Sequence, residues 1–157
     1  MAEKLQPNVD QQEPVLVITR LINAPRALVF QAWTDPKHLK HWLGVPRGFT
    51  ATVEEYDIRT GGGFMICMHS PERGDHRVRG TYREVVPPER LVFTHCWLDA
   101  DGKPGNETLV TILFNDFGGK TELTLRQTGF TSIASRDGHE QGWASTLDRF
   151  MEYVATL

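Results

Sequence analysis

The chain has 157 residues and a mass of 17.8 kDa, which suits one compact domain. Apolar residues make up 39% and charged residues 24%, so the chain can bury a core and is not disordered. Seventeen basic against twenty acidic residues give a net charge of -3 with no basic cluster, and no apolar stretch is long enough to cross a bilayer. We therefore expect neither a nucleic-acid nor a membrane partner. The supply of 8 Phe, 4 Trp and 3 Tyr is large for so small a domain.

The cysteines and the composition of the N-terminus indicate the cellular location and the limits of the folded domain. Cys67 and Cys96 lie far apart in the sequence, outside any CxxC spacing, and no signal peptide precedes them. We expect a cytoplasmic, reducing location. Residues 1–13 are polar and without a periodic pattern, which predicts a disordered tail and a folded domain over 14–157.

The first third of the chain predicts one strand and two short helices. Residues 15–22 are rich in β-branched side chains, as strands are. Pro25 suits the first position of a helix that runs to about Thr34. The Asp-Pro pair at 35–36 repeats this signal and begins a second short helix, PKHLKHW.

After Gly48 the apolar period changes from 3.6 to 2, which predicts a run of antiparallel strands. Short segments rich in Gly, Pro, Asp and Asn separate them, and this spacing favours a meander. The six strands are expected at residues 49–58, 63–69, 76–86, 90–97, 107–115 and 119–127.

The last segment predicts a long amphipathic helix. Asp137 and Glu140 have the spacing of a capping box, and a helix of about 19 residues follows to the C-terminus. Its apolar stripe is Trp143, Leu147, Phe150 and Val154. Because it is the one long amphipathic element, we expect an α+β fold whose curved antiparallel sheet wraps around this helix.

Several segments, in this order, resemble a known family. They are APRALVFQAWTDPKHLKHWLG, DIRTGGGF, GTYREVVPPERLVFTHCW, GGKTELTLRQTGF and HEQGWASTLDRF. Together they resemble the single-domain bacterial proteins named after the activator of Hsp90 ATPase, within the START-like or Bet v 1-like (SRPBCC) superfamily of helix-grip folds. The resemblance covers residues 14–157 and implies a cavity between sheet and final helix that holds lipids, sterols, polyketides or similar apolar molecules.

Strand alternation indicates which side chains face this cavity. If Val78 and Tyr82 face inward, the neighbouring strands contribute side chains of matching parity. Most of these would serve as core in any covered sheet. The candidate ligand-binding residues are Trp33, Trp42, Phe64, Ile66, Met68, Tyr82, Glu84, Phe93, His95, Trp97, Val110, Ile112, Trp143 and Leu147.

Among these candidates, Glu84 and His95 are the polar exceptions. A buried polar group costs about 1–3 kcal/mol when unpaired, so these two either bond each other, lie at the open end or contact a ligand. Our leading hypothesis is a protein that binds a small hydrophobic molecule without catalysis, and that needs no cofactor or metal. The first alternative is an enzyme similar to polyketide cyclases and aromatases, with Glu84, His95 and Tyr82 as acid and base groups.

A second alternative is an Hsp90-type chaperone partner. We expect this less, because the proteins that give the family its name carry a further N-terminal domain, for which a 13-residue tail is too short. The sequence is also compatible with a homodimer, since both edges of an open sheet are available for pairing.

Three local motifs favour structural readings. The triple glycine at 61–63 precedes a strand rather than a helix, which favours a turn over a phosphate loop. His38 and His41 share a helix face, but no third ligand has a supporting spacing and lysines flank them. The cysteines, even beside His69 or His95, are expected to pack as inert thiols.

Overall fold

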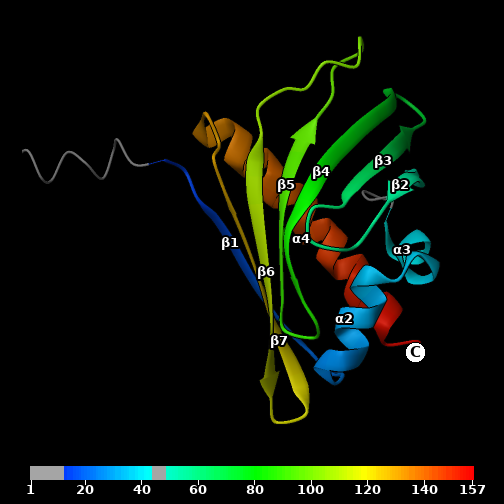
Figure 1. The fold of residues 1–157 in the computed structure, drawn as a ribbon, viewed down its shortest axis with the longest axis vertical. Coiled ribbons are helices and arrows are strands. Elements are labelled where there is room, and N and C mark those ends of the chain that lie inside the picture. Colours follow the sequence, from blue (N-terminus) through cyan, green and yellow to red (C-terminus); the bar gives the residue numbers. More distant parts are fainter. Residues whose placement is uncertain (1–12, 44–48) are drawn as a thin grey trace, which may run out of the picture.

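The structure is a computed structural model, and it describes residues 13–43 and 49–157. Seven strands form one antiparallel sheet in the order β1-β7-β6-β5-β4-β3-β2, and three helices accompany it (Figure 1). The strands are β1 Leu16–Ile22, β2 Thr50–Tyr56, β3 Gly63–Ser70, β4 Gly74–Val86, β5 Arg90–Trp97, β6 Thr108–Phe117 and β7 Lys120–Thr128. The helices are α2 Arg26–Thr34, α3 Pro36–Trp42 and α4 Ile133–Val154.

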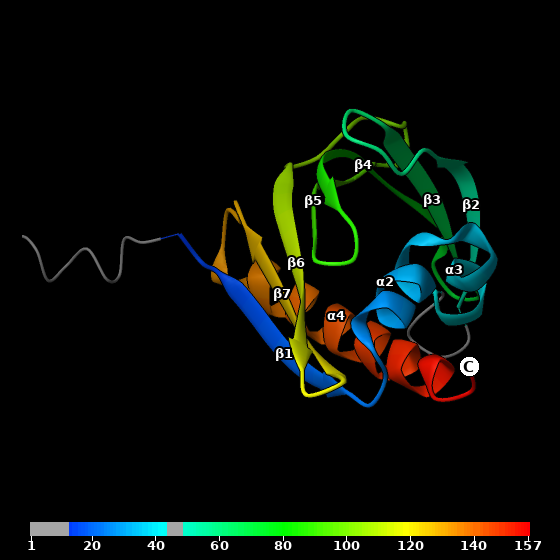
Figure 2. The ribbon, with the colours of Figure 1, turned by 60° about the horizontal axis from the view of Figure 1, so that its bottom comes forward.

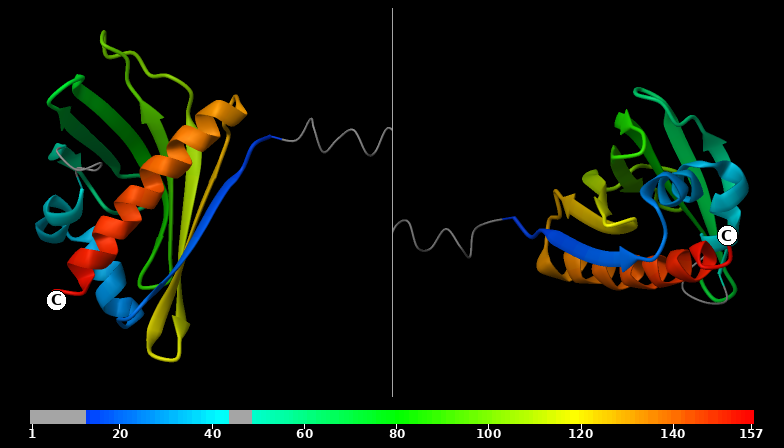
Figure 3. Two further views of the ribbon diagram at one scale, coloured as in Figure 1. Left: turned by 180° about the vertical axis from the view of Figure 1, so that it is seen from behind. Right: turned by 90° about the horizontal axis from the view of Figure 1, so that it is seen from below.

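The expected α+β helix-grip architecture is confirmed. From β2 to β7 each strand pairs with its successor, and β1 closes the order by pairing with β7. The sheet curls around the helices, and α4 runs obliquely along its inner side (Figures 2 and 3). The expected tail of residues 1–13 falls almost wholly outside the described residues.

The long helix begins earlier than the sequence predicts. Its N-cap is Ser132, whose hydroxyl accepts a hydrogen bond from the Ser135 amide at 3.0 Å. Asp137 therefore lies inside α4, and the predicted capping box was wrong. Two glycines in this first part of the helix weaken the helical pattern, which is why the sequence concealed these turns.

α4 lies along one side of the curved sheet. Its first turns reach the start of β1, where the Arg136 guanidinium donates to the Val15 carbonyl at 3.1 Å. Further along, Asp148 pairs with Arg20 of β1 at 3.8 Å. The helix also packs against α3, and these contacts hold its second half over the sheet.

Aromatic rings fill the space under the second half of α4. Phe150 contacts Trp42 and Trp33 with ring centroids 4.8 and 5.0 Å apart, and Phe114 of β6 meets Trp33 at 6.4 Å. The Trp42 indole donates its N–H to the Ala32 carbonyl at 3.0 Å, so this buried polar atom is paired. This cluster is part of the buried core.

The inner face of β4 requires a glycine. A Cβ on Gly80 would lie 1.9 Å from the Thr94 carbonyl oxygen and within 2.6 Å of two Phe64 ring atoms. Phe64 stands opposite Gly80 in the β3–β4 register, so its ring occupies the space that a side chain would fill.

We predict that Gly80→Ala destabilises the fold by at least about 1–3 kcal/mol, because a backbone oxygen and an aromatic ring must both move. Urea unfolding measures the difference. Gly138→Ala is the matched control, since a Cβ there meets nothing within 4 Å and Ala is the better helix former by about 1 kcal/mol. Equal stability of wild type and Gly80→Ala would contradict the packing described.

Candidate functional site

A pocket of about 910 Å³ lies between the inner face of the sheet and the first half of α4. This volume lies at the upper end of the range for small-molecule sites, about 300–1,000 Å³. The strands β3, β4 and β5 supply its floor, and α3 and α4 supply its walls. Its lining also includes exposed polar residues in and beside the turn between β3 and β4, namely Glu72, Arg73 and His76.

Small residues on α4 keep this space free. Ala134, Gly138 and Gly142 recur every fourth residue and line the pocket together with Ser135 and Ser145. A Cβ added at Gly138 or Gly142 would meet nothing within 4 Å. The first half of the helix thus borders the pocket, while the bulky second half fills the core.

Three aromatic rings form the apolar floor. Phe64, Tyr82 and Phe93 stand on neighbouring strands, and each pair of ring centroids is 5.6 Å apart. Edge-to-face packing of this kind holds the rings in place. The floor is therefore rigid and offers flat apolar surface to whatever enters.

His95 brings an unpaired polar atom to the pocket. Its side chain is buried, with only 7% of the residue exposed, and rings of Trp97, His139 and Trp143 surround it at 5.8–5.9 Å. Among the described residues, its Nδ1 atom has no hydrogen-bond partner. Burial, with a smaller contribution from His139, lowers the pKa of His95 to about 3, so the imidazole is neutral at pH 7.

A buried hydrogen-bond chain fixes the surroundings of His95. The Trp143 indole N–H donates to Gln127 Oε1 at 2.8 Å, and Gln127 Nε2 donates to Thr108 Oγ1 at 2.7 Å. Thr108 in turn donates to the His95 carbonyl at 2.9 Å. Because Gln127, Thr108 and His95 are buried and Trp143 is half-buried, the chain holds helix and strands in one arrangement.

Two tyrosines carry further hydroxyl groups near the floor. Tyr56 and Tyr82 lie edge to face with centroids 6.3 Å apart. Burial raises the pKa of Tyr56 to about 12 and also raises the pKa of Tyr82, so both are neutral donors. Within the part of the chain that the structure describes, the Tyr56 hydroxyl has no hydrogen-bond partner of good geometry, although it interacts with Tyr82.

Most of the residues expected at the cavity do line the pocket, though no bound molecule tests their role. The pocket lining includes Trp33, Trp42, Phe64, Ile66, Met68, Tyr82, Phe93, His95, Trp97 and Trp143. Val110, Ile112 and Leu147 are instead fully buried in the core. They lie where the helices pack directly on the sheet, so no space remains beside them.

The inward orientation expected for Glu84 was wrong. A β-bulge between Tyr82 and Glu84 shifts the β4–β5 register, so two consecutive residues project outward. Glu84 is exposed and forms an ion pair with Arg90 at 3.0 Å. Val85 takes the inward position and packs against the core.

The sequence did not predict several other residues that line the pocket. Tyr56 lies on a strand with a second bulge, between Val53 and Glu55, which hides its alternation. His139 and the small residues lie in the first turns of α4. The sequence predicted that this helix begins near or after them. The recurrence of small residues at a four-residue spacing was the available signal.

The histidine pair, the triple glycine and the two cysteines make contacts that are typical of structural residues. His38 hydrogen-bonds the Tyr153 hydroxyl, and His41 stacks on the same ring at 5.2 Å. Gly61 and Gly62 lie in the turn between β2 and β3, with φ of +88° at Gly61, and Gly63 begins β3. Both cysteines are free and buried, and Cys96 Sγ lies 3.4 Å from the Gly105 carbonyl.

Fold and pocket together define a helix-grip domain with an internal, mainly apolar pocket. In the described residues, no helix is both long and apolar enough to span a membrane. The family model of activator of Hsp90 ATPase homolog 1-like proteins matches residues 23–155, so the chain belongs to this family. The resemblance found in the sequence is thereby confirmed.

Solved structures support the same fold. A protein from Chromobacterium violaceum is 28% identical, with a TM-score of 0.79 over 89% of this chain and 96% of that one. The AHSA1 protein from Silicibacter pomeroyi is 25% identical, with a TM-score of 0.81 over 91% of this chain and 99% of that one. No curated protein matches this chain significantly.

We predict that Gln127→Met destabilises the protein by about 1–3 kcal/mol, because the Trp143 indole and the Thr108 hydroxyl lose a buried partner. Thermal unfolding measures the loss, and tryptophan emission reports the changed setting of Trp143. Gln31→Met, at an exposed position of α2, is the control and should change neither quantity.

We also predict that stability depends on pH through His95. Its folded pKa of about 3 lies below the unfolded value of about 6.5, so the unfolded chain binds more protons between these values. Above about pH 6.5 the free energy of unfolding is unaffected by this group. Below that pH it decreases by up to about 1.4 kcal/mol per pH unit as the pH falls.

Urea unfolding at several pH values between 7 and 4 measures this slope. His95→Phe should flatten it, whereas His76→Asn, at an exposed position, should leave it unchanged. Identical slopes for wild type and His95→Phe would contradict the assignment.

Proposed function

We propose that this protein binds a small, largely apolar and uncharged molecule in the pocket between the sheet and the first half of α4, without chemical conversion. The observation that carries the proposal is the unpaired, buried Nδ1 of His95 in an otherwise aromatic pocket. An orphaned polar atom costs about 1–3 kcal/mol, and a ligand with a hydroxyl or carbonyl group would remove this cost.

The hydrogen-bonding groups near the floor of the pocket support an uncharged ligand. His95 is neutral, and Tyr56 and Tyr82 keep their protons. None of the three offers a full charge to compensate an ion, and an unpaired ion in an apolar site is expensive. The hydrogen-bonding groups therefore suit orientation rather than ion capture.

The flat aromatic floor supports a ligand of ring-like or extended apolar shape. Phe64, Tyr82 and Phe93 present ring surfaces, and Trp143 lines the same pocket from α4. Ring surfaces stack on planar ligands and pack well against aliphatic ones. Lipids, sterols and polyketides, which the family resemblance implies, have such surfaces.

The cyclase-like alternative is weaker on these residues. Its carboxylate, Glu84, points away from the pocket and pairs with Arg90. His95, with a pKa of about 3, is a poor base at neutral pH. A binding role needs neither group to exchange a proton.

A neutral fluorescent probe, N-phenyl-1-naphthylamine, tests the proposal. We expect wild-type protein to enhance its emission and to show a raised Tm in its presence, by mass action on the folded state. Native mass spectrometry of protein purified from its source then identifies an endogenous occupant. A pocket that takes up neither probe nor natural compound would refute binding.

We predict that Gly142→Leu abolishes probe binding while maintaining or raising stability. The new side chain enters empty space, and replacing a helical glycine removes a penalty of about 1 kcal/mol. Opposite effects on binding and stability exclude simple unfolding as the cause. Glu140→Leu, exposed on the same helix and outside the pocket, is the control and should bind the probe normally.

A further inference from the structure

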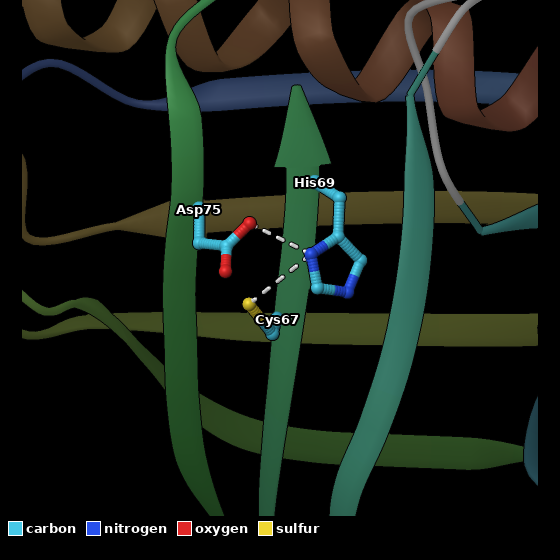
Figure 4. Close-up of side chains that lie close together, drawn as sticks. All are labelled: Cys67, His69 and Asp75. Atoms are coloured by element: carbon cyan, nitrogen blue, oxygen red, sulfur yellow. Dashed lines mark hydrogen bonds and ion pairs between the residues drawn. The ribbon is translucent and has the colours of Figure 1, made fainter. Parts of the chain in front are cut away.

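A second group of polar side chains lies on the opposite face of the sheet from the pocket. Ile66 and Met68 of β3 line the pocket, so their neighbours Cys67 and His69 project outward. Asp75, opposite His69 in the β3–β4 register, projects from the same face. Figure 4 shows the three side chains converging over β3 and β4.

The donor atoms are spaced as ligands of one ion would be. His69 Nδ1 lies 2.8 Å from Asp75 Oδ1 and 3.9 Å from Cys67 Sγ, and all three donor atoms lie within 4.8 Å of one another. Ligands around a tetrahedral Zn²⁺ are about 3.3–3.6 Å apart, given bonds of about 2.0–2.3 Å. Side-chain adjustments of less than about 1 Å would bring these atoms to such separations.

The arrangement differs from a catalytic Cys-His-Asp triad. In a triad, one imidazole nitrogen faces the nucleophile and the other faces the orienting acid. Here the thiol and the carboxylate both approach Nδ1, while Nε2 is hydrogen-bonded to Thr52 Oγ1 at 2.7 Å. Convergence on one nitrogen, with the other held by a polar neighbour, is typical of a metal-ligating histidine.

The thiol is also unsuited to attack a substrate. Cys67 is fully buried, so its thiol is closed to an incoming substrate. A metal ion, in contrast, displaces the thiol proton on binding. The side chains of His69 and Asp75 are 38% and 54% exposed, which leaves a route from solvent to the group.

A neighbouring cation is already paired with a carboxylate. Arg77, opposite Cys67 in the register, donates to both carboxylate oxygens of Glu54 at 2.8 and 3.0 Å. This bidentate pair offsets the guanidinium charge that would otherwise repel a cation. One thiolate and one carboxylate then balance the charge of a divalent ion.

We propose that Cys67, His69 and Asp75 bind a divalent transition-metal ion of the Zn²⁺ class, with a fourth position open to water. The mixture of sulfur, nitrogen and oxygen donors favours such borderline ions over Mg²⁺ or Ca²⁺, which prefer oxygen alone. Thr52 positions the imidazole through Nε2. Cys67 and His69 share one face of β3 by alternation, but Asp75 joins them only through strand pairing, so the sequence pattern did not suggest this site.

Titration of the full, untagged and reduced chain with Co²⁺ tests the proposal. We expect a thiolate-to-cobalt charge-transfer band and tetrahedral d–d absorption that saturate at one equivalent, and that Zn²⁺ removes. Cys67→Ser should lose the charge-transfer band, whereas Cys96→Ser, the matched control, should retain it.

Two further variants separate ligation from folding. Asp75→Asn and Thr52→Val change exposed positions and should weaken Co²⁺ binding by about 10–100-fold, with unchanged thermal unfolding of the metal-free protein. Absence of a thiolate band in wild type, its survival in Cys67→Ser, or an unchanged affinity in Asp75→Asn would each overturn the proposal. Because the pocket lies on the other face, Gly142→Leu should bind Co²⁺ as wild type does.

Discussion

The structure depends on one constraint. A single long helix, α4, must cover the inner face of a seven-stranded sheet. A curved sheet offers more apolar surface than a single helix can contact, and α4 packs along β1 and α3 rather than over β3 and β4. Its second half carries large side chains such as Leu147 and Phe150 and completes the core. Its first half carries small ones, so the remaining surface becomes a pocket instead of a contact.

Hydrogen bonds fix the surroundings of His95, whereas in the described residues the Nδ1 atom of its imidazole has no hydrogen-bond partner. The buried chain from Trp143 through Gln127 to Thr108 satisfies every polar atom it joins and anchors the backbone of His95. The imidazole of the same residue is left with an unpaired Nδ1. In the described residues the Tyr56 hydroxyl also lacks a hydrogen-bond partner, so the pocket offers polar atoms that a ligand from outside would pair.

The two faces of β3 and β4 carry different chemistry because of strand alternation. Ile66 and Met68 contribute to the apolar pocket, and Cys67 and His69, between and beside them, gather polar neighbours on the outer face. A side chain on one face cannot take part in events on the other. Ligand binding within the sheet and ion binding outside it would therefore be separable by mutation.

Periodicity along the chain was enough to predict the strands, the helices and their order, since each depends on neighbours a few residues away. It also placed Phe64, Tyr82, Phe93 and His95 on the inner face, because regular alternation continues through them. It failed at Glu84, where a bulge inserts one residue and reverses the parity that the sequence implied. The meeting of Cys67 with Asp75 depended on the register of the β3–β4 hairpin, and the division of inward residues into pocket and core depended on how distant segments pack. Such packing is set by side-chain volume and strand register across the whole domain, which no local pattern records.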